Sequence, residues 1–228
     1  MSNVITHLAV ADKLYASLGG GVIQNLPLFF GGNIAPDAVH AKKDCRRSDK
    51  VRSHLCEGII AYGYGDPSAA QLFDGRVNEF FKKYYFTEHE NKDVYLGYIV
   101  HLLVDQADVF AVCEYIAEQW KNNGMNTDEL EFREKIINEM SSGRYKDFFS
   151  ISVNGYPFKI NVLQALDSVW DYEVKDYINS DEINSEQRWV MDTCFKSAPM
   201  QDMEKNARTM RFVDVTAEKI TERLRGMI

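Results

Sequence analysis

The sequence of 228 residues contains only five histidines, five prolines and four cysteines. The cysteines are widely spaced and include no C-x-x-C pair, so we expect free thiols rather than disulfides or a cysteine zinc site; they are Cys45, Cys56, Cys113 and Cys194. No uninterrupted apolar run approaches about 18 residues, so we expect no transmembrane segment. The first residues lack the basic region of a signal peptide, and we therefore predict a cytoplasmic protein.

Several sequence signatures of enzymes are also missing. There is no phosphate loop of the P-loop type, no Gly-x-Ser-x-Gly elbow and no paired Cys–His nucleophile motif. Basic residues are the minority, because 26 lysines and arginines against 34 aspartates and glutamates leave a net charge of −8. This balance argues against a general nucleic-acid-binding protein. Hydrophobic residues make up 45% and charged residues 26%, proportions that exclude a disordered chain.

Most of the sequence has helical periodicity. Apolar residues at positions 4, 8, 11, 15 and 18 share one helical face. Further helices are predicted over residues 50–62, 68–86, 93–120, 127–140, 161–178, 185–195 and 200–227, and a Gly/Pro-rich loop over residues 19–37. Alternating side chains before Asn154-Gly155 favour a short β-hairpin near residues 148–160. We predict one all-α domain over residues 1–228, with seven or eight helices and that hairpin.

The most informative segment is Tyr98-Ile99-Val100-His101-Leu102-Leu103-Val104-Asp105. Its surroundings are apolar on every side, so we expect this helix to be buried. His101 and Asp105 are four residues apart and share one face of the helix. A buried carboxylate is costly unless a cation or a hydrogen-bond donor meets it. A divalent metal ion would satisfy both side chains, and so would a structural network in which the two bond each other or nearby backbone.

Three other residues have ordinary structural interpretations when each is taken alone. His7 lies on the apolar face of the first predicted helix, where a lone histidine is typically a satisfied core residue. Asp37 follows Pro36 in the glycine-rich loop, as the N-cap of a helix would. His54 follows basic residues and precedes Leu55, a setting typical of a partly buried structural histidine.

Taken together and in order, these sites resemble the zinc-dependent phospholipase C family, whose helical fold is shared by the single-strand-specific zinc nucleases. The matching elements are Thr6-His7, Gly32-Asn33-Ile34-Ala35-Pro36-Asp37, Ser53-His54-Leu55 and the helix from Gly97 to Asp105, within residues 4–110. The resemblance implies that Asp37, His54, His101 and Asp105 surround one zinc ion. It also implies that Asp105 bridges to a second metal bound by His7. Imidazole nitrogen and carboxylate oxygen are suitable zinc ligands.

The sequence departs from this family's pattern after His101, because no histidine follows that residue. The family's three-metal site takes further histidines and a glutamate downstream, and Asp108 and Glu114 do not lie in such a motif. The secreted members also use their processed N-terminal residue as a ligand, whereas Met1 lies six residues before His7. We therefore predict one or two Zn²⁺ ions rather than three.

From these residues we predict a metal-dependent, phospholipase C-like hydrolase, a phosphodiesterase that acts on a phosphoester small molecule or a lipid head group. The metal would lower the pKa of a bound water, and the resulting hydroxide would attack phosphorus. By resemblance, Asp37 is the catalytic carboxylate that helps to take the proton. The alternative is a non-catalytic or regulatory helical protein in which one zinc ion, held by Asp37, His54 and His101, locks three helices together. The His-Asp class of helical phosphohydrolases needs an adjacent His-Asp pair, which the sequence lacks.

Two histidines, one basic segment and the second half of the sequence are not assigned a functional role. His40 is either a solvated loop residue or a neighbour of the metal site, and His89 lies in a polar surface loop. The basic residues between His40 and Arg52 either hold an anionic substrate or form a solvated helix face paired with local acids. Residues 4–125 carry the motifs. Residues 126–228 carry none that we recognise, and they are left to shape the pocket or a homo-oligomer surface.

Overall fold

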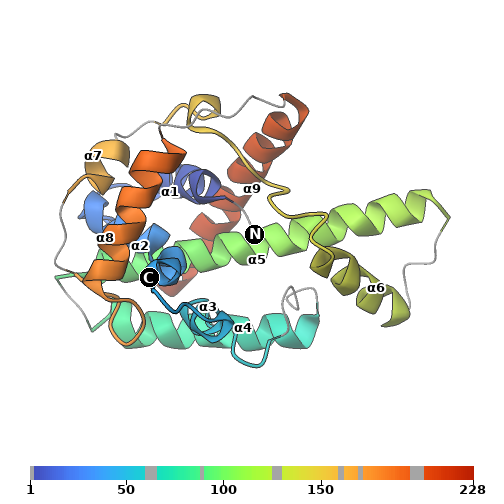
Figure 1. Cartoon of the computed structure of the whole chain (residues 1–228), viewed down its shortest axis with the longest axis horizontal. Helices are drawn as coiled ribbons and strands as arrows, with labels where there is room; N and C mark the ends of the chain where they lie inside the picture. The colour runs from blue at the N-terminus through green and yellow to red at the C-terminus, as the bar shows by residue number, and fades with distance from the viewer. Residues whose placement is uncertain are drawn as a thin grey trace.

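The computed structural model describes residues 3–59, 66–87, 90–124, 130–158, 162–168, 172–195 and 203–228 and confirms an all-α fold (Figure 1). Its described residues form α1 (Val4–Leu18), α2 (Leu26–Ile34), α3 (Arg47–Ser53), α4 (Pro67–Phe80), α5 (Lys92–Asn122), α6 (Leu130–Ser141), α7 (Val162–Leu166), α8 (Ser180–Trp189) and α9 (Met203–Met227). Short 3-10 helices at Ala35–Ala41 and Val153–Gly155, and π-helical turns at Phe81–Tyr85 and Val190–Cys194, extend or join them. The four cysteines are free thiols.

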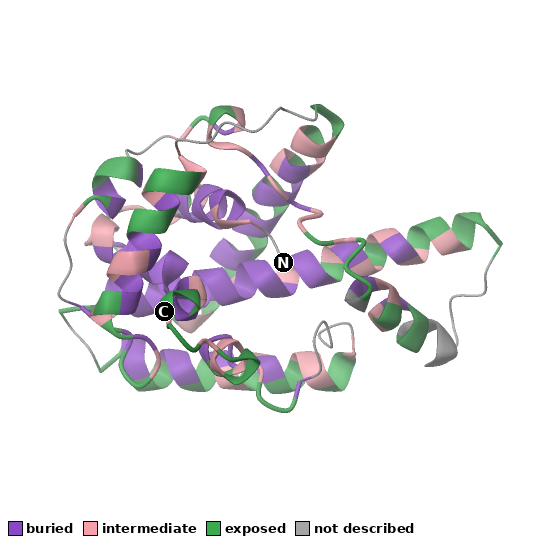
Figure 2. Ribbon diagram, in the orientation of Figure 1, coloured by how far each residue is buried: buried purple, intermediate pink, exposed green. Residues whose placement is uncertain are grey.

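α5 is the central element of the molecule and runs along its length (Figure 1). Its first half is buried among the other helices, whereas its second half projects from the body beside α6 and is more exposed (Figure 2). By length and composition α5 could cross a membrane, but 78% of its apolar window is buried inside the protein. Such burial is the pattern of a core helix.

Glycines bring α2 and α5 into close backbone contact. A Cβ atom on Gly97 would lie 2.0 Å from the Phe29 carbonyl oxygen, and one on Gly32 would lie 2.0 Å from the Val94 carbonyl oxygen. Only a residue without a side chain permits this approach. The contact places the C-terminal end of α2, and the 3-10 helix that follows it, beside the buried half of α5.

The prediction of a loop over residues 19–37 is confirmed for residues 19–25 and wrong beyond them, because α2 begins at Leu26 and a 3-10 helix follows it. The Asn25 side chain caps the helix by accepting a hydrogen bond from the Leu28 N–H, and Pro27 occupies the first turn. Asp93 on α5 accepts a hydrogen bond from the Asn25 N–H and anchors that end. Gly31 and Gly32 serve close packing, whereas Gly19, with φ of 70°, ends α1, and sequence alone does not distinguish these two uses of glycine.

The helix predicted over residues 50–62 is instead α3, which begins earlier and ends at Ser53. Leu55 adopts a left-handed backbone with φ of 55°, and its carbonyl oxygen accepts a hydrogen bond from Arg76 of α4 at 2.9 Å. Residues 60–62 lie outside the described residues. The early end places His54 at the C-cap of the helix, where its ring turns inward.

The hairpin predicted near residues 148–160 is also wrong, since the described residues 148–158 contain no strand. The Ser150 N–H donates to the Thr209 hydroxyl at 3.2 Å, and the Ser150 carbonyl accepts from it at the same distance. The Asn3 side chain donates to the Ile151 carbonyl at 3.2 Å. Side chains of α9 and of the chain preceding α1 thus take the backbone groups that a partner strand would have paired.

The remaining predicted helices are largely confirmed. α4 with its π-helical turn matches residues 68–86, α5 matches 93–120, and α6 and α9 match the described parts of 127–140 and 200–227. α8 begins earlier than predicted, because Asn179 and Glu182 form a capping box at its start. The helix over 161–178 is wrong beyond Leu166: residues 169–171 lie outside the described part, and Val174 and Ile178 form an isolated antiparallel bridge.

Candidate metal centre

Five side chains from separate segments of the chain converge at the buried half of α5. α1 contributes one, the 3-10 helix after α2 a second, the end of α3 a third, and α5 two; in that order they are His7, Asp37, His54, His101 and Asp105. These are the five residues that the sequence indicated as metal ligands. The structure places all five in one cluster.

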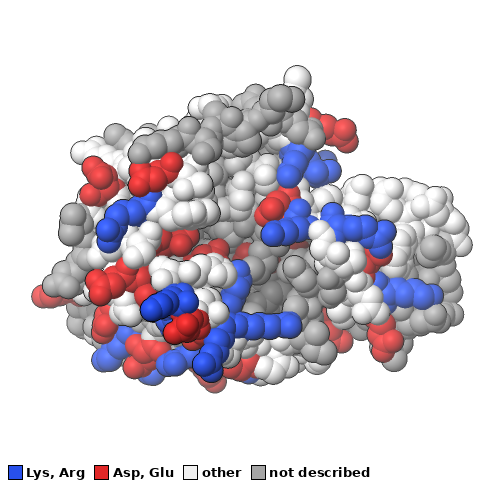
Figure 3. All heavy atoms as spheres, in the orientation of Figure 1, with Lys and Arg blue, Asp and Glu red and all other residues white. Residues whose placement is uncertain are grey.

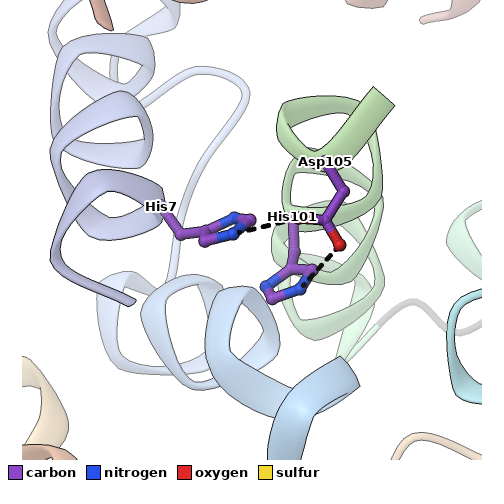
Figure 4. A group of neighbouring side chains, drawn as sticks. All are labelled: His7, His101 and Asp105. Carbon is purple, nitrogen blue, oxygen red and sulfur yellow. Dashed lines mark ion pairs between the residues drawn. The ribbon is translucent and has the colours of Figure 1, made fainter. Parts of the chain in front are cut away.

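Asp105 lies at the centre of the cluster. Its Oδ1 is 3.3 Å from His7 Nε2, and its Oδ2 is 3.5 Å from His54 Nε2 and 3.7 Å from His101 Nε2. Figure 4 shows His7 reaching toward this carboxylate from α1 and His101 reaching toward it from α5; the two imidazole rings stack on each other, with their centroids 3.9 Å apart. The two carboxylate oxygens therefore face different histidines.

Asp37 completes the cluster through contacts with His54 and His101. Its Oδ1 is 3.4 Å from His54 Nε2, and its Oδ2 is 3.8 Å from His101 Nε2. Two groups of three potential ligands result, His7 with His101 and Asp105, and Asp37 with His54 and His101. Within each group the ligand atoms lie within 4.8 Å of one another.

Backbone carbonyls fix the orientation of two of the imidazoles. His101 Nδ1 lies 2.7 Å from the Asn33 carbonyl oxygen, and His54 Nδ1 lies 3.0 Å from the Lys50 carbonyl oxygen. A carbonyl oxygen only accepts, so His101 Nδ1 carries the proton and donates it, and the same tautomer of His54 satisfies the Lys50 carbonyl, with the Ser53 hydroxyl 2.9 Å from that nitrogen. The lone pair of each Nε2 then points into the cluster, which is the tautomer and orientation of a metal-ligating histidine.

The cluster is buried yet poor in hydrogen bonds. His7, His54, His101 and Asp105 are only 1–4% exposed. Among the described residues, neither the three Nε2 atoms nor the two Asp105 oxygens have a hydrogen-bond partner. Buried polar atoms are rarely left in this state. Ligand atoms that share one tetrahedral zinc ion lie about 3.4 Å apart, and the separations found here, 3.3–3.8 Å, fit such an ion.

The electrostatics of the cluster also suit a metal ion. Burial disfavours the charged carboxylates, but the interaction with His7, followed by those with His101 and His54, outweighs burial and holds the pKa of Asp105 well below its usual range. The pKa of Asp37 is likewise well below its usual range: His54, His101 and Lys50 outweigh its burial. Burial, with nearby His7, lowers the pKa of His101 to about 3. Ionised carboxylates and a neutral imidazole are the forms that bind metals.

The cluster meets solvent at Asp37, whose side chain is 25% exposed. Lys50 Nζ lies 3.0 Å from Asp37 Oδ1 and 3.4 Å from His40 Nε2. His40 is itself 54% exposed, with Nε2 3.8 Å from Asp37 Oδ1. His40 is therefore both solvated and adjacent to the cluster, and it belongs to neither group of three ligands. His89 lies outside the described residues.

Sequence reasoning missed Glu186 of α8, a buried residue that interacts electrostatically with Asp37 and Lys50. Burial, followed by the charge of Asp37, raises the pKa of Glu186 to about 7. A signal was present, because Glu186 lies three residues after Ile183 and four before Val190, on the buried face of the helix.

Two other acidic residues of α5 stay outside the cluster. Asp108 is buried one turn after Asp105 but belongs to neither group of three ligands, and Glu114 is exposed. No known family model, curated protein or solved structure matches the chain. The geometry of the cluster is therefore the basis for a functional proposal.

Proposed function

We propose that this protein is a metal-dependent hydrolase of phosphoesters, with zinc as the metal and with Asp37, His54, His101, Asp105 and His7 as its ligands. One observation carries the proposal: three imidazole nitrogens and a buried carboxylate face one another at the separations of ligands to a common ion, and these atoms have no hydrogen-bond partner in the described part of the chain. Imidazole nitrogen and carboxylate oxygen are suitable ligands for zinc and for other divalent transition metals, and we propose zinc because the ordered ligand set resembles that of a zinc-dependent family.

The ligands divide between two positions. Asp37, His54 and His101 would hold one ion, and His7 would hold a second, because Asp105 turns one oxygen toward His7 and the other toward His54 and His101. Sites with three or fewer protein ligands keep a position for water or substrate, which is typical of catalytic zinc. Bound in this way, the metal would supply an acidified water molecule and polarise a phosphoryl oxygen.

Asp37 is the proposed catalytic carboxylate. It is the member of the cluster most exposed to solvent, so an attacking water molecule meets it first. Its low pKa keeps it ionised at neutral pH, and an ionised carboxylate accepts a hydrogen bond from that water and directs its lone pair toward phosphorus.

A structural zinc site is the competing proposal, and one observation favours it. Asp105 Oδ2 faces both His54 and His101, so with Asp37 four protein ligands could close around a single ion. A closed four-ligand site is typical of structural zinc. Cobalt substitution separates the two: a four-coordinate visible spectrum insensitive to added phosphate supports the structural site, and a spectrum that shifts with phosphate supports the hydrolase.

Metal content and activity test the hydrolase directly. We expect purified protein to hold one or two zinc ions per chain and to hydrolyse a nitrophenyl phosphodiester or phosphomonoester, with activity lost on chelation and restored by zinc. His101→Ala should lose both bound metal and at least about 100-fold in activity, since outer-shell changes alone cost 10- to 100-fold. Glu114→Gln, exposed on the same helix, is the control and should keep both. Unchanged metal content in His101→Ala would remove the proposal.

A further inference from the structure

Ser53 is the last residue of α3 and directly precedes the proposed ligand His54. It is only 1% exposed, so its hydroxyl is sealed from solvent. Serine is not among the five proposed ligands, and the hydroxyl has another task. A buried hydroxyl is retained where its hydrogen bonds are made within the protein. The partners of this one lie on two segments that carry proposed ligands.

The Ser53 hydroxyl lies between the ring of His54 and the backbone of Pro36. Its Oγ is 2.8 Å from the Pro36 carbonyl oxygen and 2.9 Å from His54 Nδ1. Because a carbonyl oxygen only accepts, the hydroxyl donates its proton to Pro36. The lone pairs of Oγ then remain free to accept the Nδ1 proton of His54. The result is a directed chain from the imidazole through the hydroxyl to the Pro36 carbonyl.

The Lys50 carbonyl does not replace Ser53 in this arrangement. It already accepts the helical hydrogen bond from the His54 N–H at 3.0 Å, and it lies 3.0 Å from His54 Nδ1 as well. Ser53 Oγ is 3.1 Å from the same oxygen, farther than from the Pro36 carbonyl. A carbonyl oxygen has two lone pairs for these three donors. The hydroxyl therefore bonds Pro36, and the imidazole proton is shared between Lys50 and Ser53.

This chain of hydrogen bonds joins two ligand segments from behind. Pro36 directly precedes Asp37 on the 3-10 helix that follows α2, whereas His54 caps the end of α3. In the cluster itself, Asp37 Oδ1 and His54 Nε2 are 3.4 Å apart. One buried oxygen atom thus connects the backbone beside one proposed ligand to the ring of the other.

The backbone around Ser53 is held by side chains of two other helices. The Tyr98 hydroxyl donates to the Ser53 carbonyl, and Tyr98 is fully buried on α5, about one turn before His101. Arg76 of α4 donates to the Leu55 carbonyl at 2.9 Å. Leu55 has the unfavourable left-handed backbone, with φ of 55°. Such a conformation persists where surrounding contacts hold it.

We propose that Ser53 is a positioning residue of the metal centre: its hydroxyl holds the Asp37 segment against the ring of His54, and Tyr98 holds Ser53 on α5. This inference rests on the ligands named in the proposed function and adds a residue outside that set. Groups that orient metal ligands from behind strengthen metal binding and activity. Ser53 would act on the metal only through Asp37 and His54.

The test is zinc affinity of the full chain, measured by competition with a chromophoric chelator. Ser53→Ala should weaken zinc binding about 10- to 100-fold, the usual loss when an outer-shell partner is removed. Ser53→Thr keeps the hydroxyl and should stay within about threefold of the wild type. The visible spectrum of bound cobalt should differ between Ser53→Ala and the wild type, because two of its ligands are held less firmly.

Thr221→Val is the matched control. Thr221 is also buried, and its hydroxyl donates to the Ala217 carbonyl of its own helix, α9, at 2.7 Å. We expect this variant to lose stability in urea much as Ser53→Ala does, while zinc affinity stays within about twofold of the wild type. The comparison separates the general loss of a buried hydrogen bond from a loss of ligand positioning.

Tyr98→Phe tests the same link from α5. It removes one hydroxyl and leaves the ring in place, and it should weaken zinc binding less than Ser53→Ala. Both changes act through Ser53, so their effects in the double variant should combine to less than the product of the two. Should Ser53→Ala not fold, Tyr98→Phe decides the proposal, and wild-type zinc affinity in that variant would then overturn it.

The possible failures of the two proposals are distinguishable. Ser53→Ala that binds zinc as tightly as the wild type, with the same cobalt spectrum, removes the positioning role and leaves the metal centre intact. Equal losses of zinc affinity in Ser53→Ala and Thr221→Val also remove it, because the loss would then reflect stability alone. A wild-type protein that binds no zinc removes both proposals.

Discussion

At the scale of single residues, the cluster is defined by side chains that ordinary folding would not bury together. Asp105 and His101 gain little from each other at 3.7 Å, and yet both are sealed from water. Sequence reasoning found the five proposed ligands because each type of ligand stands at a spacing that resembles a known family. It could not find the atoms that orient them, since the carbonyls of Asn33 and Lys50 belong to no side-chain pattern.

Glu186 gives a prediction about pH. The folded protein holds the proton of Glu186 up to about pH 7, whereas the unfolded chain releases it near pH 4.5. The unfolded state therefore binds fewer protons across this window, and the free energy of unfolding falls as pH rises. In metal-stripped protein, Glu186→Gln should raise the free energy of unfolding by up to about 3 kcal/mol at pH 8 and by little at pH 4.5.

Urea unfolding at the two pH values measures this difference. Glu114→Gln, at an exposed position of α5, is the control and should change the free energy of unfolding about equally at both pH values. An equal effect of Glu186→Gln at pH 4.5 and pH 8 would show that this carboxyl group is ordinary in the folded state.

At the scale of elements, the close contact of α2 with α5 positions the centre. It brings the Asn33 carbonyl to His101 and starts the 3-10 helix that carries Asp37. The sequence predicts α5 correctly because its apolar run is long. The sequence does not predict α2, because glycines in a sequence usually indicate a loop. Their packing against the backbone of α5 is visible only in the structure. The prediction of the hairpin fails because the Thr209 side chain, distant in sequence, takes the backbone groups of Ser150.

Gly97→Ala tests this element-scale account. The added Cβ would lie 2.0 Å from the Phe29 carbonyl oxygen and 2.8 Å from the Asn33 N, so the two helices must separate. We expect a loss of about 1–3 kcal/mol or more in the free energy of unfolding, with weaker zinc binding. Gly75→Ala on α4 is the control, because its Cβ meets nothing within 4 Å and should stabilise the helix by about 0.5–1 kcal/mol. Equal stability of the two variants in urea would contradict the close packing.

At the scale of the whole molecule, the single all-α domain follows from composition and periodicity, and the net charge of −8 is spread among charges of both signs on the face seen in Figure 3. Figure 3 shows lysines and arginines interspersed with aspartates and glutamates over the face in view. The proposed centre joins α1, the chain between α2 and α3, the end of α3 and the middle of α5, which no local pattern could place together. Only the ordered set of sequence sites predicted their meeting.

Anomalous X-ray diffraction at the zinc edge, from crystals of zinc-loaded protein, tests the central claim most directly. The account predicts a peak about 2.0–2.2 Å from His101 Nε2, His54 Nε2 and an Asp37 oxygen, with a second peak between His7 and Asp105 if two ions bind. The same crystals grown from His101→Ala should lose the first peak. No zinc peak within the cluster, or zinc bound only at the surface, would contradict the account.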